Sequence, residues 1–430
     1  MKTQELTSLL SNAERLGARG IVSELVSIVR REDIPAREAV RRIDIALSTF
    51  RRLWGEDPAP DARILLNLAE SYEALGALSR AEEGYEEILA QVKSSEDAKL
   101  EADVLRRLGR ILRKRSLWER ALGRISEARS IYEGLDDQEG IADCFLTEGI
   151  INSERGQYPA ATTAFESALE IAEGRSIPRV TCSATLNLGI VGLWTGDHDH
   201  AIARFNEVLT IAEQIDRPAS LARAHHNLGL CYTFQDQWES ALDAFEKSLE
   251  IAEEVGNLEM IGNTYVQKAY VYLRLSDRTL TANYCARSLD IFEEIQRPLG
   301  TADAYKILGR LMGDRGDFAT GMSLLEQGLA FFREYDNPLG EAETIREIGE
   351  LERARRDRDR KRDPSTGDRH LRPNRRSRPD RPNPRHPGQL TPMTEAQRES
   401  RQQDERTALL SRLRKVDLTL ERRKRRRHCE

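Results

Sequence analysis

The stretch GDHDH at residues 196–200 is the densest group of potential metal ligands in the chain. Imidazole nitrogens and carboxylate oxygens are common ligands of zinc and other transition metals. However, Tyr158 and Trp238 stand forty residues to either side of His198, which suggests that this position is used for packing. We therefore favour a packing role for His198 over metal binding.

The other histidines and the cysteines are poorly placed for joint chemistry. His225 and His226 are adjacent, so on a helix they would point about 100° apart, which does not suit chelation by both. The five cysteines form no CxxC pair, and their odd number and wide spacing argue against a disulfide framework. We expect most of them to be small buried core residues. They are Cys144, Cys182, Cys231, Cys285 and Cys429.

Common catalytic signatures are missing from the sequence. It contains no glycine-rich phosphate loop, no HExxH, no GxSxG and no EF-hand loop. We expect a protein that is not an enzyme and that holds no cofactor and no metal, and an enzyme with an unrecognised site is the least favoured alternative.

The chain repeats with a period of forty residues. Between residues 69 and 349, steps of forty from Gly229 reach only glycine or alanine, which permit two helices to approach closely. A second series of alanines follows on a later helix. An apolar residue four positions after each alanine completes one apolar stripe per helix, so each repeat reads as a helical hairpin. The first series is Ala69, Gly109, Gly149, Gly189, Gly229, Ala269, Gly309 and Gly349; the second is Ala81, Ala121, Ala161, Ala201 and Ala241; the third is Tyr85, Ile125, Phe165, Phe205 and Phe245.

Four prolines keep the same period between hairpins: Pro178, Pro218, Pro298 and Pro338. Proline suits the first turn of a helix, where its missing N–H costs nothing, so each one is predicted to begin a hairpin.

This order of small and aromatic residues resembles the tetratricopeptide repeat, which usually has a period of about 34 residues. The forty-residue form is similar to the arrays of kinesin light chains, Pins-type adaptors and bacterial peptide-responsive quorum regulators. The resemblance implies an all-α fold, a right-handed superhelical solenoid of antiparallel helix pairs. The sixth repeat departs from the pattern with Thr281 and Cys285, and the seventh with Gly321 and Leu325.

The repeats divide the chain into four predicted parts. Residues 1–60 form an N-terminal helical cap with a degenerate repeat, and residues 61–340 form seven hairpins. Residues 341–362 form a truncated eighth repeat or capping helix. Residues 363–430 form a disordered tail rich in arginine and proline, with a marginal helix over 395–427.

Charge is divided unevenly between the array and the tail. Residues 351–430 hold 26 Lys and Arg against 13 Asp and Glu, and the first 350 residues hold 40 against 59. A basic tail could fold back on the acidic array or meet an anionic partner. The amino-acid composition of the tail also resembles that of a GC-rich gene translated out of frame. A frameshift product is therefore an alternative to a genuine basic tail.

The remaining basic residues do not predict a specific nucleic-acid site. The final ERRKRRRH could attract phosphates by charge, but no aromatic residues interleave to stack on bases. The run RRLGRILRKR at 106–115 is either a patch for an acidic peptide or, as we favour, a solvated helix face. No run of eighteen apolar residues occurs, so we expect a soluble cytoplasmic protein without a membrane partner.

The predicted binding site follows from the resemblance. Asn227 lies about 200° around its helix from Gly229, on the side that lines the concave groove in the family, and an asparagine ladder there is similar to one that grips an extended peptide. The alternative is that these amides bond across to the next repeat. The predicted groove residues are Asn67, Arg106, Arg110, Leu186, Asn187, Ile190, Arg223, His226, Asn227, Leu230, Gln267, Tyr270, Lys306 and Arg310.

These features favour a scaffold or adaptor that binds a peptide segment of a partner protein. The alternative is a regulatory sensor in which a small peptide changes the activity of a partner. The identity of the partner and the oligomeric state do not follow from the sequence.

Overall fold

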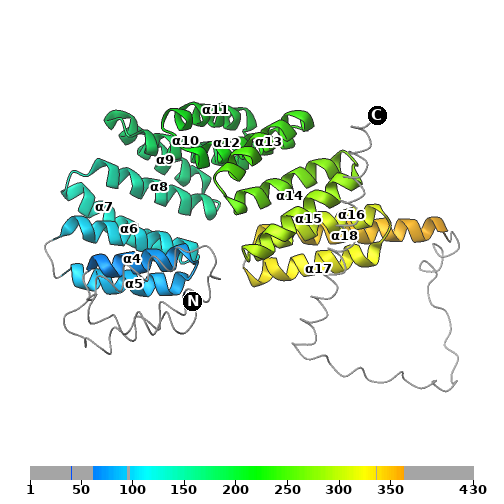
Figure 1. Cartoon of the computed structure of the whole chain (residues 1–430), viewed down its shortest axis with the longest axis horizontal. Coiled ribbons are helices and arrows are strands. Elements are labelled where there is room, and N and C mark those ends of the chain that lie inside the picture. The colour runs from blue at the N-terminus through cyan, green and yellow to red at the C-terminus, as the bar shows by residue number, and fades with distance from the viewer. Residues whose placement is uncertain (1–39, 41–61, 94–96, 336, 363–430) are drawn as a thin grey trace, which may run out of the picture. The chain divides into compact units, whose positions relative to one another are not determined.

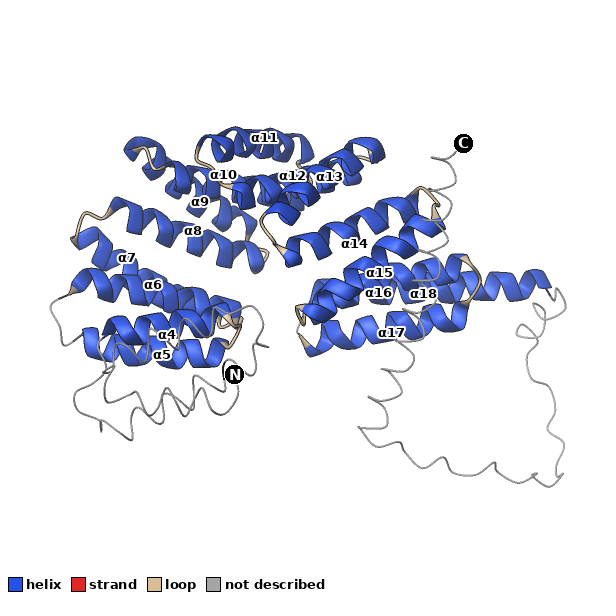
Figure 2. Ribbon diagram, viewed as in Figure 1, coloured by secondary structure: helices blue, strands red, loops and turns tan. Residues whose placement is uncertain are grey.

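A computed structural model describes residues 40, 62–93, 97–335 and 337–362 of the chain. Over these residues the secondary structure consists of α-helices joined by short turns, without a β-strand (Figures 1 and 2). The predicted all-α fold is confirmed. The predicted N-terminal cap and the tail lie outside the described residues.

Helices come in pairs that follow the forty-residue period. The first helices are α4 (Ala62–Ala74), α6 (Ala98–Lys114), α8 (Gln138–Glu154), α10 (Pro178–Thr195), α12 (Pro218–Phe234), α14 (Leu258–Arg274), α16 (Pro298–Asp314) and α18 (Pro338–Arg362). The second helices are α5 (Leu78–Val92), α7 (Trp118–Gly134), α9 (Tyr158–Arg175), α11 (His198–Gln214), α13 (Trp238–Glu254), α15 (Arg278–Glu294) and α17 (Phe318–Glu334). The four periodic prolines each begin a first helix, as predicted.

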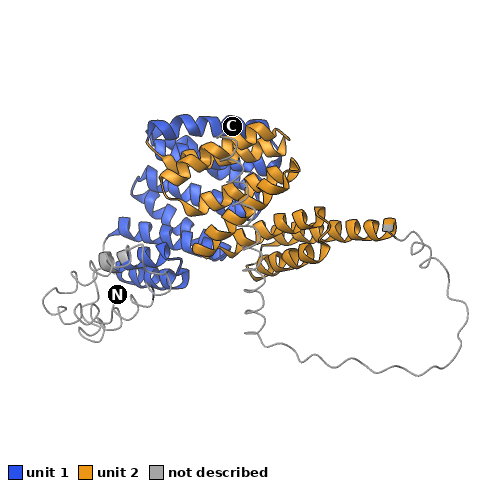
Figure 3. Ribbon diagram, turned by 45° about the vertical axis from the view of Figure 1, so that its right-hand side comes forward, with its two compact units in different colours: residues 1–215 blue, residues 216–430 orange. Residues whose placement is uncertain are grey.

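The chain divides into two compact units, Met1–Ile215 and Asp216–Glu430 (Figure 3). In the described part of the first unit, α6 packs against its second helix α7 and against the next first helix α8, and α8 packs in the same way against α9 and α10. The second unit repeats this pattern, since α12 contacts α13 and α14, and α14 contacts α15 and α16. Each unit is therefore two layers of helices, one of first helices and one of second helices.

The turns between helices also recur regularly along the chain. Most of them contain one residue in the left-handed region of backbone space. Glycine adopts this conformation without strain, and asparagine and aspartate tolerate it. Several turns also place an aspartate or asparagine at the start of the next helix, where its side chain accepts a backbone N–H. The left-handed residues are Gly76, Ser116, Asp136, Gly156, Ser176, Gly196, Asp216, Asp236, Gly256, Ser276, Gln296 and Gly316.

Close helix contact explains the periodic glycines. A Cβ atom at Gly229 would lie 2.5 Å from Cε1 of Phe245, and one at Gly189 would lie 2.6 Å from the same atom of Phe205. Real side chains do not approach so closely, so these positions exclude alanine unless the aromatic ring moves. The partner alanines Ala201 and Ala241 are fully buried, as predicted for tight helix crossings.

A second size rule operates between consecutive repeats. Phe292 near the end of α15 packs against Gly300 in α16, where a Cβ would lie 2.5 Å from the ring. Ala252 stands in the position of Phe292 one repeat earlier, and Met260 stands in the position of Gly300. A large residue thus faces glycine and a small residue faces a larger one. Tyr132 with Gly140 and Phe332 with Gly340 repeat the first combination.

The two repeats that depart from the motif still pack. Thr281, Cys285 and Leu325 are fully buried, and a hydrogen bond ties the Thr281 hydroxyl to the backbone oxygen of Asp277 at 2.8 Å. In the described residues, no helix combines the length and apolar character that crossing a membrane requires.

Candidate functional site

The exposed side of the first helices is the candidate site, and we name it the first-helix face. On α12 it consists of Arg223, Asn227, Leu230 and Phe234, whose spacing of four, three and four residues places them along one side of the helix. Gly229, on the opposite side, faces Phe245 on α13. The equivalent residues of α14, forty positions later, are Asn263, Gln267, Tyr270 and Arg274.

On α12 and α14 this face carries amides and apolar side chains. Asn227 and Gln267 are partly exposed, and within the described residues their side-chain amides have no hydrogen-bond partner. Leu230 and Tyr270 are partly exposed beside them, and the side chain of Phe234 is 56% exposed. These two amides therefore do not bond across to the neighbouring repeat, which was the alternative to a binding role.

His226 joins α12 to α14 instead of pointing outward. Its Nδ1 lies 3.1 Å from the hydroxyl of Thr264, and its ring packs against Phe245 with 5.6 Å between the ring centroids. Burial, with a smaller contribution from the positive charge of Arg223, lowers the pKa of His226 to about 4. The imidazole is therefore neutral at neutral pH and holds two first helices together.

On α10, in the first unit, the predicted residues are less uniform. Asn187 donates a hydrogen bond from Nδ2 to the backbone oxygen of Ser183, four residues earlier on its own helix, at 2.8 Å. Leu186 is only 2% exposed, so its predicted place in the groove is wrong, because it packs in the helical interior. Ile190 is partly exposed and Trp194, one turn later, is 50% exposed. The side chain of Asn67 lies outside the described residues.

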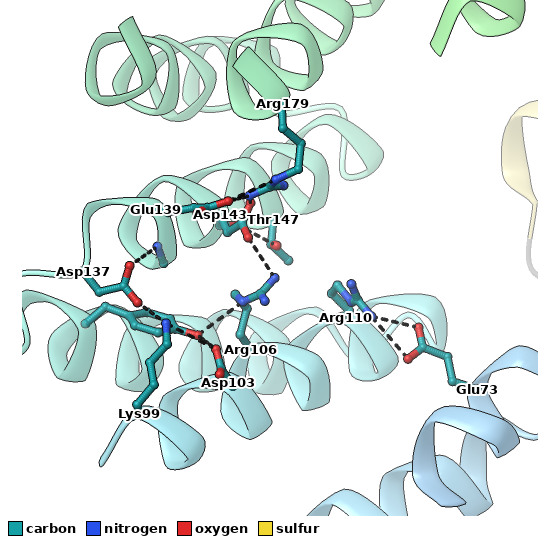
Figure 4. A network of polar contacts seen from close by, with 12 residues as sticks. Glu73, Lys99, Asp103, Arg106, Arg110, Asp137, Glu139, Asp143, Thr147 and Arg179 are labelled. Carbon is teal, nitrogen blue, oxygen red and sulfur yellow. Dashed lines mark hydrogen bonds and ion pairs between the residues drawn. The ribbon is translucent and has the colours of Figure 1, made fainter. Parts of the chain in front are cut away.

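Arg106 and Arg110 form ion pairs that join three consecutive first helices (Figure 4). Arg106 lies 3.2 Å from a carboxylate oxygen of Asp143 on α8, and Arg110 lies 3.3 Å from Glu73 on α4. Asp143 also accepts a hydrogen bond from Arg179 on α10 at 2.9 Å. Burial by itself would lower the pKa of Arg106, but the negative charges of Asp143 and Asp103, together with the hydrogen bond to Tyr132, raise it above its usual value.

Each of the other described cations of this basic run also has a carboxylate partner. Arg107 pairs with Glu70, Arg113 with Glu154, Lys114 with Glu73 and Arg115 with Glu82. Since these pairs consume the charge of the run, the geometry supports a face paired with neighbouring acidic residues and does not favour a patch for an acidic peptide.

Lys306 and Arg310 on α16 are likewise paired with α18. Lys306 donates to Glu343 at 2.6 Å and to Asp303 at 3.2 Å. Arg310 donates to Glu347 at 2.8 Å and to Glu350 at 2.6 Å. Ion pairs thus cover the first-helix face on α16, whereas α12 and α14 carry uncharged side chains at its centre.

The stretch GDHDH begins α11 and serves the turn. Asp197 is the N-cap of α11, and its side chain accepts a hydrogen bond from the backbone N–H of His200 at 3.2 Å. Across the described ranges, no three His, Cys, Asp or Glu side chains are grouped as metal ligands would be.

The four described cysteines are buried. Burial raises the pKa of Cys144 and of Cys231 to about 12, so both thiols stay protonated at neutral pH. A protonated, enclosed thiol is a poor nucleophile, and these cysteines act as core residues.

Sequence comparison identifies the repeat. Residues 100–174 and 180–254 match the family model described as "Tetratricopeptide repeat". No curated protein sequence matches the chain.

Several solved structures share the fold. The Rap conjugation gene regulator of the plasmid pLS20, in complex with the Phr* peptide, is 16% identical, covers 77% of this chain and 93% of its own, and has a TM-score of 0.56. A Rap protein complexed with Competence and Sporulation Factor is 14% identical over 83% of this chain and 99% of its own, with a TM-score of 0.50. A signal transduction ATPase with a tetratricopeptide repeat sensor from Pyrococcus horikoshii is 14% identical, with coverages of 80% and 55% and a TM-score of 0.50.

Proposed function

Because the chain carries tetratricopeptide repeats, we propose that it is a protein-interaction scaffold that binds an extended peptide segment of a partner on the first-helix face of α12 and α14. The observation that carries the proposal is the pair of unpartnered amides, Asn227 and Gln267, set one repeat apart beside apolar side chains. A side-chain amide offers both a donor and an acceptor, so it can pair with the N–H and C=O of a peptide bond.

Apolar neighbours supply the second part of the recognition. Phe234, Leu230 and Tyr270 present apolar surface on the same face, where side chains of the peptide would be removed from water. On α16, the cations Lys306 and Arg310 are occupied by internal ion pairs. The expected ligand is therefore an extended peptide with apolar side chains, not a strongly acidic one.

One solved structure with this fold contains the bound Phr* peptide, and another contains bound Competence and Sporulation Factor, which is consistent with the proposal. The regulatory alternative is that such a peptide changes the activity of a partner. Small-angle X-ray scattering with and without a bound peptide separates the two, because a sensor must differ in conformation between the free and bound states.

The site can be tested by photo-crosslinking. Peptides are selected from a displayed random library with the full chain as bait, and a benzoylphenylalanine then replaces Tyr270. We expect it to crosslink to the selected peptide, while the same replacement at Asn206, exposed on α11, does not. Selected peptides that crosslink at Asn206 and not at position 270 would place the binding site on the second helices.

A further inference from the structure

The last helix, α18, has one apolar side that no described element covers. Its residues Ala342, Ile345 and Glu352 are exposed, and Ile348 and Gly349 are partly exposed; Ile345 is 48% exposed. The equivalent residues of α16, forty positions earlier, are buried beneath α17: Ala302, Tyr305, Leu308, Gly309 and Met312. We name the side of α18 formed by residues 342, 345, 348, 349 and 352 the open face.

Gly349 shows that the open face has the shape of a helix contact. A Cβ at Gly309 would lie 2.7 Å from Cγ of Leu325 on α17, whereas a Cβ at Gly349 would meet no described atom within 4 Å. Ile345 and Ile348 flank this glycine with apolar surface. The combination of a small residue and apolar neighbours is the one that receives a second helix in every preceding repeat of the second unit.

The sequence directly after α18 cannot supply that second helix. Arg356 stands where Gly316 ends α16 with a positive φ, and α18 continues to Arg362 instead of turning (Figure 1). Arg358 in this extension donates a hydrogen bond to the backbone oxygen of Gly316 at 2.8 Å. The helix that covers the open face must therefore come from farther along the chain or from another molecule.

Residues 395–427 of the same chain have the required pattern. Leu409, Leu413, Val416 and Leu420 are spaced by four, three and four residues, which would align them on one side of a helix. The chain continues for 68 residues beyond Arg362, and the 32 residues at 363–394 provide enough length to return to α18. Loop closure costs grow slowly with length, so a long connection is tolerated.

Charge complementarity selects an antiparallel arrangement. In α18, residues 338–352 hold five glutamates and one arginine, while residues 353–362 hold seven basic and two acidic residues. In the later segment, residues 395–411 hold four acidic and three basic residues, and residues 412–427 hold nine basic and two acidic residues. An antiparallel pair places the basic half of each helix beside the more acidic half of the other.

We propose that residues 395–427 dock as a helix, antiparallel to α18, on the open face and complete an eighth hairpin. Leucine side chains of this segment then cover Gly349, as Leu325 covers Gly309. Residues 395–427 would then cap the array. They would be the second helix of the eighth hairpin, joined to its first helix, α18, by a long connection.

Hydrogen–deuterium exchange of the full chain tests this docking. The variant Leu409→Asp/Leu413→Asp places two charges on the docking side, and Thr407→Asp/Ser411→Asp places the same two charges on the opposite side. We expect amides of residues 341–352 to exchange at least about tenfold faster in the first variant, since burial of one leucine shifts an equilibrium by that factor. The control should exchange like the original chain.

Two outcomes would overturn the proposal. Equal exchange of residues 341–352 in all three proteins would show that the segment does not cover α18. An effect that disappears on tenfold dilution would assign the open face to a second copy of the chain.

A second variant, Gly349→Ala, gives an independent readout. Alanine favours an uncovered helix, so it should slow exchange of residues 341–352 in the Leu409→Asp/Leu413→Asp background. With the segment docked, the added Cβ meets a leucine and exchange should become faster. Slower exchange in both backgrounds would contradict a docked helix at this glycine.

Discussion

The size rule between α15 and α16, in which a large residue faces glycine and a small residue faces a larger one, can be tested by replacing one pair of residues with the equivalent pair of the preceding repeat. The double variant Phe292→Ala/Gly300→Met installs the pair that Ala252 and Met260 form one repeat earlier. Phe292→Ala alone leaves a cavity where a fully buried ring stood, at a cost of about 3 to 5 kcal/mol. Gly300→Met alone overpacks the contact, because even a Cβ at this position would lie 2.5 Å from the Phe292 ring, and the cost is about 1 to 3 kcal/mol.

The two changes should compensate each other because they meet at the same contact. The methionine fills the space of the lost ring, and its helix propensity exceeds that of glycine by about 0.5 to 1 kcal/mol. We expect the double variant to be more stable than the sum of the single variants by about 1 to 3 kcal/mol. Urea denaturation followed by circular dichroism measures all four proteins, and strictly additive losses would refute the size rule.

Three further predictions concern single sites. Stability should fall as the pH drops from about 6.5 to about 4, because the unfolded chain takes up a proton on the His226 ring and the native imidazole, with its lowered pKa, does not. The loss is at most about 3 kcal/mol. Urea denaturation of His226→Gln should show less pH dependence. Ala241→Leu should overpack the crossing of α12 and α13 by about 1 to 3 kcal/mol and lower the melting temperature, whereas Lys247→Leu on the exposed side of α13 should not. Arg106→Ala should cost about 3 kcal/mol of stability, because it leaves Asp143 with one cation fewer in a largely enclosed network. Arg204→Ala should cost less than about 1 kcal/mol, because Arg204 pairs with Glu207 at the exposed surface. Equal losses by urea denaturation would contradict this account of the ion pairs.

Much of the fold was accessible from the sequence because the repeat forces each residue type to recur at one structural position. Gly229 and Phe245 stand sixteen residues apart, as Gly149 and Phe165 and also Gly189 and Phe205 do, and the structure confirms that each glycine touches its phenylalanine. The pairing of Phe292 with Gly300 was missed, although glycine stands eight residues after an aromatic residue here, at Tyr132 and Gly140, and at Phe332 and Gly340, which carried the signal.

The candidate site was less accessible, since it depends on side-chain conformation and on distant partners. Asn187 and Asn227 share one repeat position, yet only Asn187 bonds to the backbone of its own helix. The carboxylates that neutralise Arg310 stand 37 and 40 residues away, and the spacing of the arginine alone did not reveal them. The division into two units at Ile215 leaves no mark in the forty-residue period.

The affinity of a selected peptide for the double variant Asn227→Ala/Gln267→Ala tests the central claim most directly. Isothermal titration calorimetry gives Kd, and thermal unfolding gives stability, for this variant, for the original chain and for the control Asn206→Ala/Gln214→Ala on α11. We predict at least a tenfold increase in Kd, since each lost amide leaves peptide groups unpaired at about 1 to 3 kcal/mol, together with a change in stability within about 1 kcal/mol. An unchanged Kd, or a Kd that rises only as far as in the control, would contradict peptide binding on this face.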